Sequence, residues 1–216
     1  MQAIGKFTRE LWESAFPVYQ QLVSCRFVTE LSAGTLAKES FAHYLTQDIL
    51  YLNKDAEALG MLAKRSKNDT YRDYFKSLEK DGLEVEFVLR NEYLQHFNLQ
   101  EAKMQSKAFA DYSNFLVNHA KNSPLEIAYA ALLPCFWMYG AVADSIIHKN
   151  IGNNPYQKFI DTYAGDEYQY YTHKFIELVE RSSANSQYQE QMKEVFIEAC
   201  RHELAVFEES YDIALN

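Results

Sequence analysis

Cys135 has the most distinctive chemical setting in the sequence. It follows Pro134 inside an apolar stretch from Glu126 to His148, whose pattern predicts a helix buried in a bundle. A proline within a helix cannot donate a hydrogen bond to the carbonyl four residues back, so Pro134 should release the carbonyl of Ala130 and bend the helix. We expect this bend just before Cys135, where it leaves room beside the sulfur.

Tyr139 lies one helical turn after Cys135, so the ring and the thiol share a face and can line one pocket. A thiol in such a pocket is a candidate nucleophile. Buried cysteines also pack as small hydrophobic residues, and the spacing alone leaves that alternative open. The stretch is interrupted by polar residues and is short between charges, which argues against a membrane span.

Two carboxyl groups stand in runs of otherwise apolar residues. Asp48 lies in a core-like helical run and shares a face with Tyr51, three residues later. Glu203 lies in the last predicted helix, where Leu204 and Phe207 are among its neighbours. Burying a carboxylate is costly unless it is paired, so each group is either a functional residue or an exposed one. With the thiol and tyrosines, the carboxyl groups suit nucleophilic addition to a polarised ring.

The composition favours one compact helical domain over residues 1–216, because the chain has 16 Tyr and 14 Phe but only 7 Gly and 4 Pro. A net charge of -9 without a basic stripe argues against nucleic acid as a partner. Cys25, Cys135 and Cys200 are widely spaced and are expected to be free thiols. The first residues lack a signal-peptide pattern, which predicts a cytoplasmic protein.

Common cofactor and metal motifs are not found. The sequence lacks glycine-rich phosphate loops and the serine nucleophile elbow. Carboxylate-bridged di-metal bundles use Glu-x-x-His pairs, and no Glu here is followed three residues later by His. Asp144 with His148, and His202 next to Glu203, are weak metal signals. We therefore expect no metal and no cofactor.

The hydrophobic pattern predicts an all-α protein of seven or eight helices with no strand. Pro17 should kink the first helix or begin a new turn. Loops are expected near Leu31–Thr35 and at Asn150–Pro155, where Gly, Asn and Pro gather. The predicted helices cover about 7–22, 38–65, 71–97, 106–120, 126–148, a short helix ending at Tyr163, 166–182 and 186–213.

Several separated motifs resemble the TenA, or thiaminase II, family. They are Leu132–Tyr139 (LLPCFWMY), Gln47–Tyr51 (QDILY), Tyr156–Tyr163 (YQKFIDTY), Tyr112, and His202–Glu203 with Phe207. They occur in the family's order and cover nearly the whole chain. The resemblance implies a single-domain helical bundle of the haem-oxygenase type. It also implies a homo-oligomer, usually a tetramer.

Family members of this cysteine-bearing type hydrolyse an aminopyrimidine, either releasing it from thiamine or salvaging it from thiamine breakdown products. The resemblance implies that Cys135 is the nucleophile that adds to the pyrimidine ring and that Glu203 moves protons as acid and base. It further implies substrate-binding roles for Asp48 at the amino group, Tyr163 at a ring nitrogen, Tyr51 and Tyr139 as clamps on the ring, and Tyr112 in the pocket wall.

Two positions depart from the family pattern. Val206 stands where members often have an aromatic residue, with Phe207 following, and Arg90 stands where relatives often have histidine. Both departures leave the exact substrate open. It is either thiamine or a degraded or formylated aminopyrimidine. Two other functions remain as alternatives: a module that binds an aminopyrimidine without turnover, and a metal-dependent oxidase on the same bundle.

Overall fold

A computed structural model describes residues 2–100, 102–147 and 153–213, with only the backbone at 81–83, 85 and 86. These residues form an all-α bundle without strands, as predicted. The helices are α1 (Lys6–Ser24), α2 (Arg26–Ala33), α3 (Lys38–Arg65), α4 (Asp69–Ser77), the π-helical turn η1 (Leu78–Gly82), α5 (Leu83–Phe97), α6 (Lys107–Asn122), α7 (Leu125–Leu132), α8 (Pro134–Ile147), α9 (Gln157–Ala164), α10 (Asp166–Ser183) and α11 (Gln189–Asp212).

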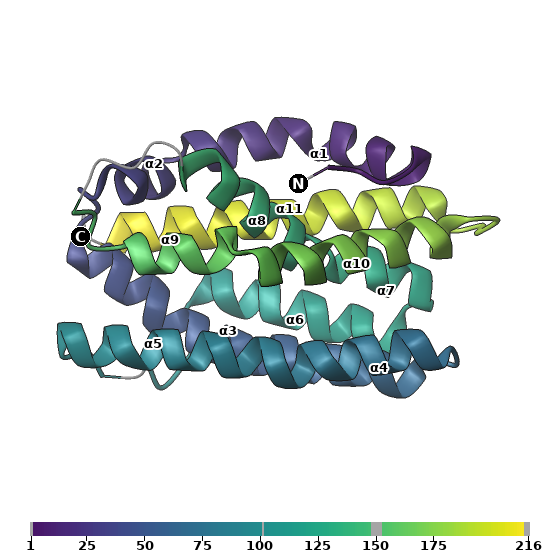
Figure 1. The fold of residues 1–216 in the computed structure, drawn as a ribbon, viewed down its shortest axis with the longest axis horizontal. Helices are drawn as coiled ribbons and strands as arrows, with labels where there is room; N and C mark the ends of the chain where they lie inside the picture. The colour runs from purple at the N-terminus through teal and green to yellow at the C-terminus, as the bar shows by residue number, and fades with distance from the viewer. Residues whose placement is uncertain (1, 101, 148–152, 214–216) are drawn as a thin grey trace.

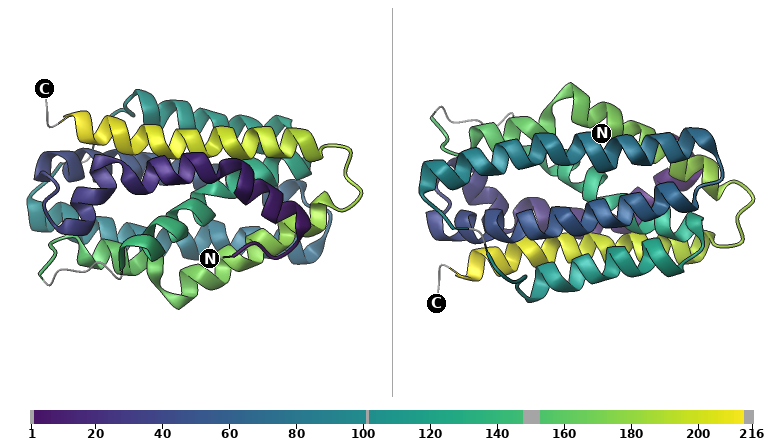
Figure 2. Two further views of the ribbon diagram at one scale, coloured as in Figure 1. Left: turned by 90° about the horizontal axis from the view of Figure 1, so that it is seen from above. Right: turned by 90° about the horizontal axis from the view of Figure 1, so that it is seen from below.

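Two long helices organise the bundle. The last helix, α11, packs against α1, α6 and α7, while α3 packs against α4, α5 and α6 (Figure 1). Figure 2 shows α11 running beside α1 in the view from above and beside α6 in the view from below. Helices α7 and α8 pass between these outer helices and contact α11 as well. Side chains from distant parts of the sequence therefore meet in the centre of the bundle.

The predicted bend in the central stretch lies at a one-residue interruption between two helices, at Leu133. Helix α7 ends at Leu132 and α8 begins at Pro134, which occupies the first helical position, where a missing N–H costs nothing. The amides of Phe136 and Trp137 both donate to the carbonyl of Leu133, at 3.1 and 3.0 Å. Cys135 consequently lies in the first turn of a new helix. His148 lies outside the described residues.

The expectation that this stretch is too polar and too short to cross a membrane was wrong. Leu125–Ile147 comprises 23 residues with a mean hydropathy of 1.5, which is long and apolar enough by length and composition. The hydrophobic window is 67% buried inside the bundle, however, and the break at Pro134 interrupts it. The core of a bundle demands the same apolar composition as a bilayer, so hydropathy alone does not separate them.

The helix count was too low, because the described residues contain eleven α-helices and one π-helical turn. The predicted loop at Leu31–Thr35 begins later than expected, since α2 continues to Ala33 and ends at Gly34 in the left-handed conformation, φ 71°. Pro17 lies inside a continuous α1. The predicted helix 71–97 is divided by η1 into three segments. Part of the predicted loop Asn150–Pro155 lies outside the described residues.

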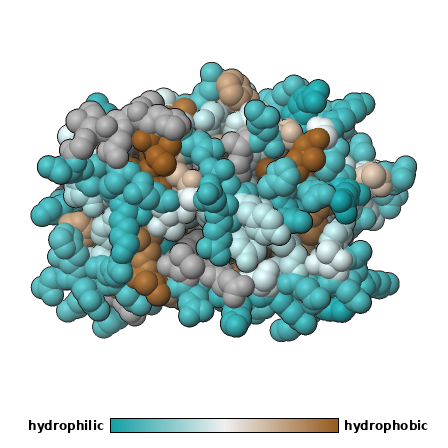
Figure 3. Space-filling model, in the orientation of Figure 1, coloured by the Kyte–Doolittle hydropathy of each residue, from teal (hydrophilic) through white to brown (hydrophobic). Residues whose placement is uncertain are grey.

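Aromatic rings fill much of the core. Trp12 of α1 stacks on Trp137 of α8, with ring centroids 5.2 Å apart, and Phe75 stacks on Tyr129 at 5.2 Å. The face of the molecule in Figure 3 is mostly hydrophilic, with scattered apolar spots. The core therefore takes up most of the large apolar side chains, and some of the tyrosines direct their hydroxyls into a polar cluster.

Candidate active site

Two tyrosine hydroxyls lie within hydrogen-bond distance of the Cys135 sulfur at the start of α8. Tyr51 of α3 donates a hydrogen bond to its Sγ at 2.9 Å, and the Tyr112 hydroxyl of α6 lies 3.0 Å from the same atom. Burial raises the pKa of the Cys135 thiol well above its ordinary value, and the charges of Asp55 and Glu203 raise it further. The hydrogen bonds with Tyr112 and Tyr51 offset only part of this increase in the pKa. The resting sulfur is thus a thiol, and its use as a nucleophile requires a base.

Glu203 of α11 is the buried carboxyl group that the Tyr112 hydroxyl links to Cys135. It is fully buried, and its Oε1 accepts a hydrogen bond of 2.6 Å from the Tyr112 hydroxyl. Its Oε2 accepts no hydrogen bond from any residue that the structure describes. Burial raises the pKa of Glu203 well above 4.5; the bond from Tyr112 offsets part of this, and the charges of Asp48 and Asp55 add to it.

Tyr112 connects the thiol to the carboxyl group. Its single hydroxyl proton is directed at Glu203, so the contact with Cys135 is one in which the thiol donates to the tyrosine oxygen. The sulfur meanwhile accepts a hydrogen bond from Tyr51. The rings of Tyr51 and Tyr112 stack with centroids 5.1 Å apart. A continuous path for a proton therefore runs from Cys135 through Tyr112 to Glu203.

A second polar group surrounds Asp48 on α3. Arg90 of α5 donates from Nε to Asp48 Oδ2 at 2.7 Å, and its Nη2 bonds the same oxygen. The same Nη2 donates to the Tyr163 hydroxyl at 2.8 Å. Arg90 and Asp48 are 1% and 2% exposed, so the pair is buried. Burial raises the pKa of Asp48, and the Arg90 guanidinium offsets part of this effect.

Tyr139 lies one turn after Cys135 in α8 and faces the second polar group. Its hydroxyl lies 2.9 Å from that of Tyr44, and its ring packs against Tyr163 at 5.4 Å and Phe207 at 5.6 Å. These three rings line a small apolar cavity of about 20 Å³. In α11, the ring that packs against Tyr139 belongs to Phe207, the residue after Val206.

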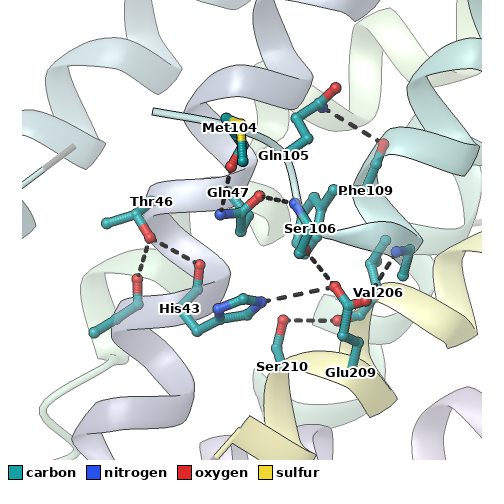
Figure 4. Close-up of polar contacts among 12 residues, drawn as sticks. His43, Thr46, Gln47, Met104, Gln105, Ser106, Phe109, Val206, Glu209 and Ser210 are labelled. Atoms are coloured by element: carbon teal, nitrogen blue, oxygen red, sulfur yellow. Dashed lines mark hydrogen bonds and ion pairs between the residues drawn. The ribbon is translucent and has the colours of Figure 1, made fainter. Parts of the chain in front are cut away.

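The N-terminus of α6, which carries Tyr112, is anchored on both sides (Figure 4). Glu209 of α11 accepts the amide of Ala108 at 2.9 Å and also bonds the hydroxyl of Ser106. Gln47 of α3 accepts the amide of Ser106 at 2.7 Å. A carboxylate at the first turn also complements the helix dipole. These bonds tie α6 to α3 and α11 little more than one turn before Tyr112, which fixes the position of its hydroxyl.

The structure brings together all seven residues proposed from the sequence, in two neighbouring groups. Cys135, Glu203, Tyr51 and Tyr112 form one group, and Asp48, Tyr163 and Tyr139 lie around the other.

Sequence reasoning did not assign roles to two charged residues of the site. Arg90 was noted only as a departure from the family pattern, and nothing in helical spacing pairs it with Asp48. Asp55 is 7% exposed and lies seven residues after Asp48 in α3, a spacing that could have indicated the shared face.

The residues considered for a metal do not assemble into a centre within the described part of the chain. No group of three or more His, Cys, Asp or Glu side chains is placed there to hold an ion. The ring of His202 instead stacks on Tyr112, with centroids 5.3 Å apart and planes at 8°. His148, the partner considered for Asp144, lies outside the described residues.

The fold and the site define a class: an all-α bundle that encloses a cysteine, buried carboxyl groups and tyrosine hydroxyls in one small polar centre. Residues 12–213 match the model of the TENA/THI-4/PQQC family, and the chain belongs to that family. A TenA homologue from P. horikoshii has the same fold, with a TM-score of 0.88, 23% identity, and coverage of 97% of this chain and 100% of that one.

Among the curated relatives that carry functional names, two show how far the similarity extends. The chain is 28% identical to the aminopyrimidine aminohydrolase of Bacillus subtilis, over 89% of this chain and 84% of the relative. It is 29% identical to a thiamine biosynthesis multifunctional protein of Corynebacterium efficiens, over 95% of this chain. The match spans only 28% of that longer relative.

Proposed function

We propose that this protein is an aminopyrimidine hydrolase that acts on thiamine or its aminopyrimidine breakdown products, with Cys135 as nucleophile. The observation that carries the proposal is the path from the Cys135 thiol through the Tyr112 hydroxyl to Glu203. The names of the relatives, which include aminopyrimidine aminohydrolases, support the substrate class. The product is the hydroxymethyl aminopyrimidine.

The path from Cys135 through Tyr112 to Glu203 gives the buried thiol a route by which to lose its proton. As sulfur bonds to the ring carbon beside the one that bears the methylene, its proton passes through Tyr112 to Glu203. Glu203 then delivers a proton to the ring nitrogen that gains electron density. A carboxyl group whose pKa is raised well above 4.5 by burial suits both transfers. Tyr51 continues to donate to the sulfur and stabilises developing thiolate charge.

The addition prepares the substrate for loss of the departing group. The bond between the methylene and the departing nitrogen breaks, and its electron pair leaves with that nitrogen. Asp48 holds the ring amino group, which becomes more positive as it supplies electron density. Water then adds to the methylene and gives up a proton to Glu203. The carbon–sulfur bond finally breaks, the ring nitrogen releases the proton that it received, and the sulfur regains a proton from Glu203 through Tyr112.

The other roles follow from the positions of the rings and hydroxyls. Tyr163 binds a ring nitrogen, Tyr51 and Tyr139 contact the ring faces, and Tyr112 serves in the wall as well as in the proton path. We further propose that the chain acts as one domain, without a metal or cofactor, in the cytoplasm, and as a homotetramer.

A product assay by mass spectrometry tests the function. Purified protein is incubated with thiamine and, separately, with aminomethyl aminopyrimidine, and release of hydroxymethyl aminopyrimidine is followed. Cys135→Ser should reduce the rate at least about 1,000-fold, as removal of a nucleophile commonly does. Cys25→Ser is the matched control, because Cys25 is another free cysteine outside the site. Binding of substrate without any product would instead identify a binding module.

A further inference from the structure

His202 contacts the proton path of the proposed mechanism, which gives it no role. It precedes Glu203 in α11, and its ring stacks on that of Tyr112 with centroids 5.3 Å apart and planes at 8°. Successive side chains on an α-helix point about 100° apart, so the two residues leave α11 in different directions. Both nevertheless reach Tyr112, His202 at its ring face and Glu203 at its hydroxyl.

Other rings complete the packing around Tyr112. Tyr51 of α3 stacks on it with centroids 5.1 Å apart and planes at 29°. Phe115, in the next turn of α6, contacts His202 at 5.0 Å and Tyr112 at 6.4 Å. The hydroxyl of a tyrosine lies at the far end of its ring from the backbone, so a rotation about the Cα–Cβ bond moves it the most. Contacts at the ring face restrict that rotation.

The contact of His202 with Tyr112 is one between ring faces. His202 is half-buried and lines a cavity of about 590 Å³ at the surface, together with Glu198 and Arg201. Its ring nitrogens can therefore be hydrated and need no partner inside the bundle. Burial lowers the pKa of His202, and the charge of Glu198 offsets part of this effect. Above that pKa the ring is neutral, and it offers Tyr112 a flat surface.

We propose that His202 is a positioning residue, which holds the Tyr112 ring so that its hydroxyl stays between the Cys135 sulfur and Glu203. This inference rests on the function proposed above, because it concerns the proton path of that mechanism. The hydroxyl lies 3.0 Å from the sulfur and 2.6 Å from Oε1 of Glu203. A displacement of about 1 Å would lengthen one contact beyond a hydrogen bond, and such a displacement can lower a rate about 100-fold.

The test compares the kcat of His202→Ala and His202→Phe with that of wild type, with aminomethyl aminopyrimidine as substrate. Alanine removes the ring, so kcat should fall at least about 10-fold while KM stays within about 2-fold of wild type, because binding is not affected. Phenylalanine supplies another flat ring and should keep kcat within about 3-fold of wild type. His119→Ala should leave kcat unchanged. It is the matched control, because His119 is also a half-buried histidine that packs on Phe115.

A second background separates positioning from a general structural role. In Tyr112→Phe there is no hydroxyl to position, so adding His202→Ala should lower kcat less than about 2-fold further. An equal fall with and without the hydroxyl would overturn the proposal. Wild-type kcat in His202→Ala would overturn it too, as would a fall in His202→Phe as large as that in His202→Ala.

Alkylation of Cys135 by iodoacetamide needs no turnover, so it distinguishes failure of this inference from failure of the proposed function. Mass spectrometry measures the rate in wild type, His202→Ala and Tyr112→Phe, with Cys25, which is half-buried as Cys135 is, as an internal reference. We expect the rate to fall at least about 5-fold in both variants, because the thiol loses its proton less readily. If wild type turns nothing over, that result still supports the positioning role. An unchanged or increased rate in His202→Ala overturns it.

Discussion

At the scale of single residues, the proposed mechanism depends on one hydroxyl group. Tyr112 is within hydrogen-bond distance of both Cys135 and Glu203. The thiol and the carboxyl group could each be proposed from the sequence, because each stands in an apolar helical run. The connection between them could not, since helical spacing does not show which hydroxyl lies between two distant helices.

Tyr112→Phe removes the hydroxyl and keeps the ring. We expect kcat to fall about 100-fold, because the thiol loses its route for the proton, a loss typical of general acid–base catalysis. Steady-state kinetics measures the effect. Tyr129→Phe is the matched control, because its hydroxyl bonds Ser66 in another part of the core. Unchanged kcat in Tyr112→Phe would show that the proton takes another route.

Glu203 should make stability depend on pH. Its pKa is raised in the folded state, so between its ordinary value of 4.5 and the folded value the native protein binds more protons than the unfolded chain. The free energy of unfolding therefore falls as pH rises through that window, and the contribution is fully present only below it.

Glu203→Gln removes this dependence. We expect the free energy of unfolding of the variant, relative to wild type, to increase between about pH 5 and about pH 8. Denaturant titrations of both proteins at each pH measure the difference. A difference that stays the same at both pH values would mean that the carboxyl group does not bind a proton on folding.

At the scale of elements, the break between α7 and α8 positions Cys135. Pro134 begins α8, so Cys135 lies beside the tyrosines of α3 and α6. Pro134 predicted a bend. The sequence did not show whether one helix is kinked there or whether one helix ends and another begins. A break of one residue hardly changes the apolar pattern on either side.

Pro134→Ala should affect activity more than stability. An alanine restores the amide that can donate to the carbonyl of Ala130, which favours one straighter helix and moves Cys135 away from Tyr51 and Tyr112. We expect kcat to fall at least about 10-fold through lost alignment, while the free energy of unfolding changes by less than about 1 kcal/mol. Kinetics and chemical denaturation measure the two effects. Wild-type kcat would show that the break is not needed.

The ion pair of Arg90 with Asp48 joins α5 to α3. Breaking a buried pair leaves an unpaired charge in the core, so Arg90→Met should lower the free energy of unfolding by about 3–5 kcal/mol. Adding Asp48→Asn should recover part of this loss, because the unpaired charge is then removed. Denaturant titration of the single and double variants measures the coupling, and simple additivity of the two losses would contradict it.

At the scale of the whole molecule, five helices far apart in the sequence supply the seven proposed site residues: α3, α6, α8, α9 and α11. Periodicity predicted most of these helices, and α3 began and ended at the predicted residues. It did not indicate which faces meet, because many arrangements of a bundle bury the same apolar stripes. The resemblance to a family indicated that arrangement. The ion pair of Arg90 with Asp48 and the burial of Asp55 became evident only in the structure.

The most direct test of hydrolysis through Cys135 is to run the reaction in water enriched in the heavy oxygen isotope. Wild type and Cys135→Ser are incubated with aminomethyl aminopyrimidine, and the product is analysed by mass spectrometry. The account predicts that wild type forms hydroxymethyl aminopyrimidine carrying the heavy oxygen, and that Cys135→Ser forms almost none. Product without the label, or labelled product formed by Cys135→Ser at the wild-type rate, would contradict it.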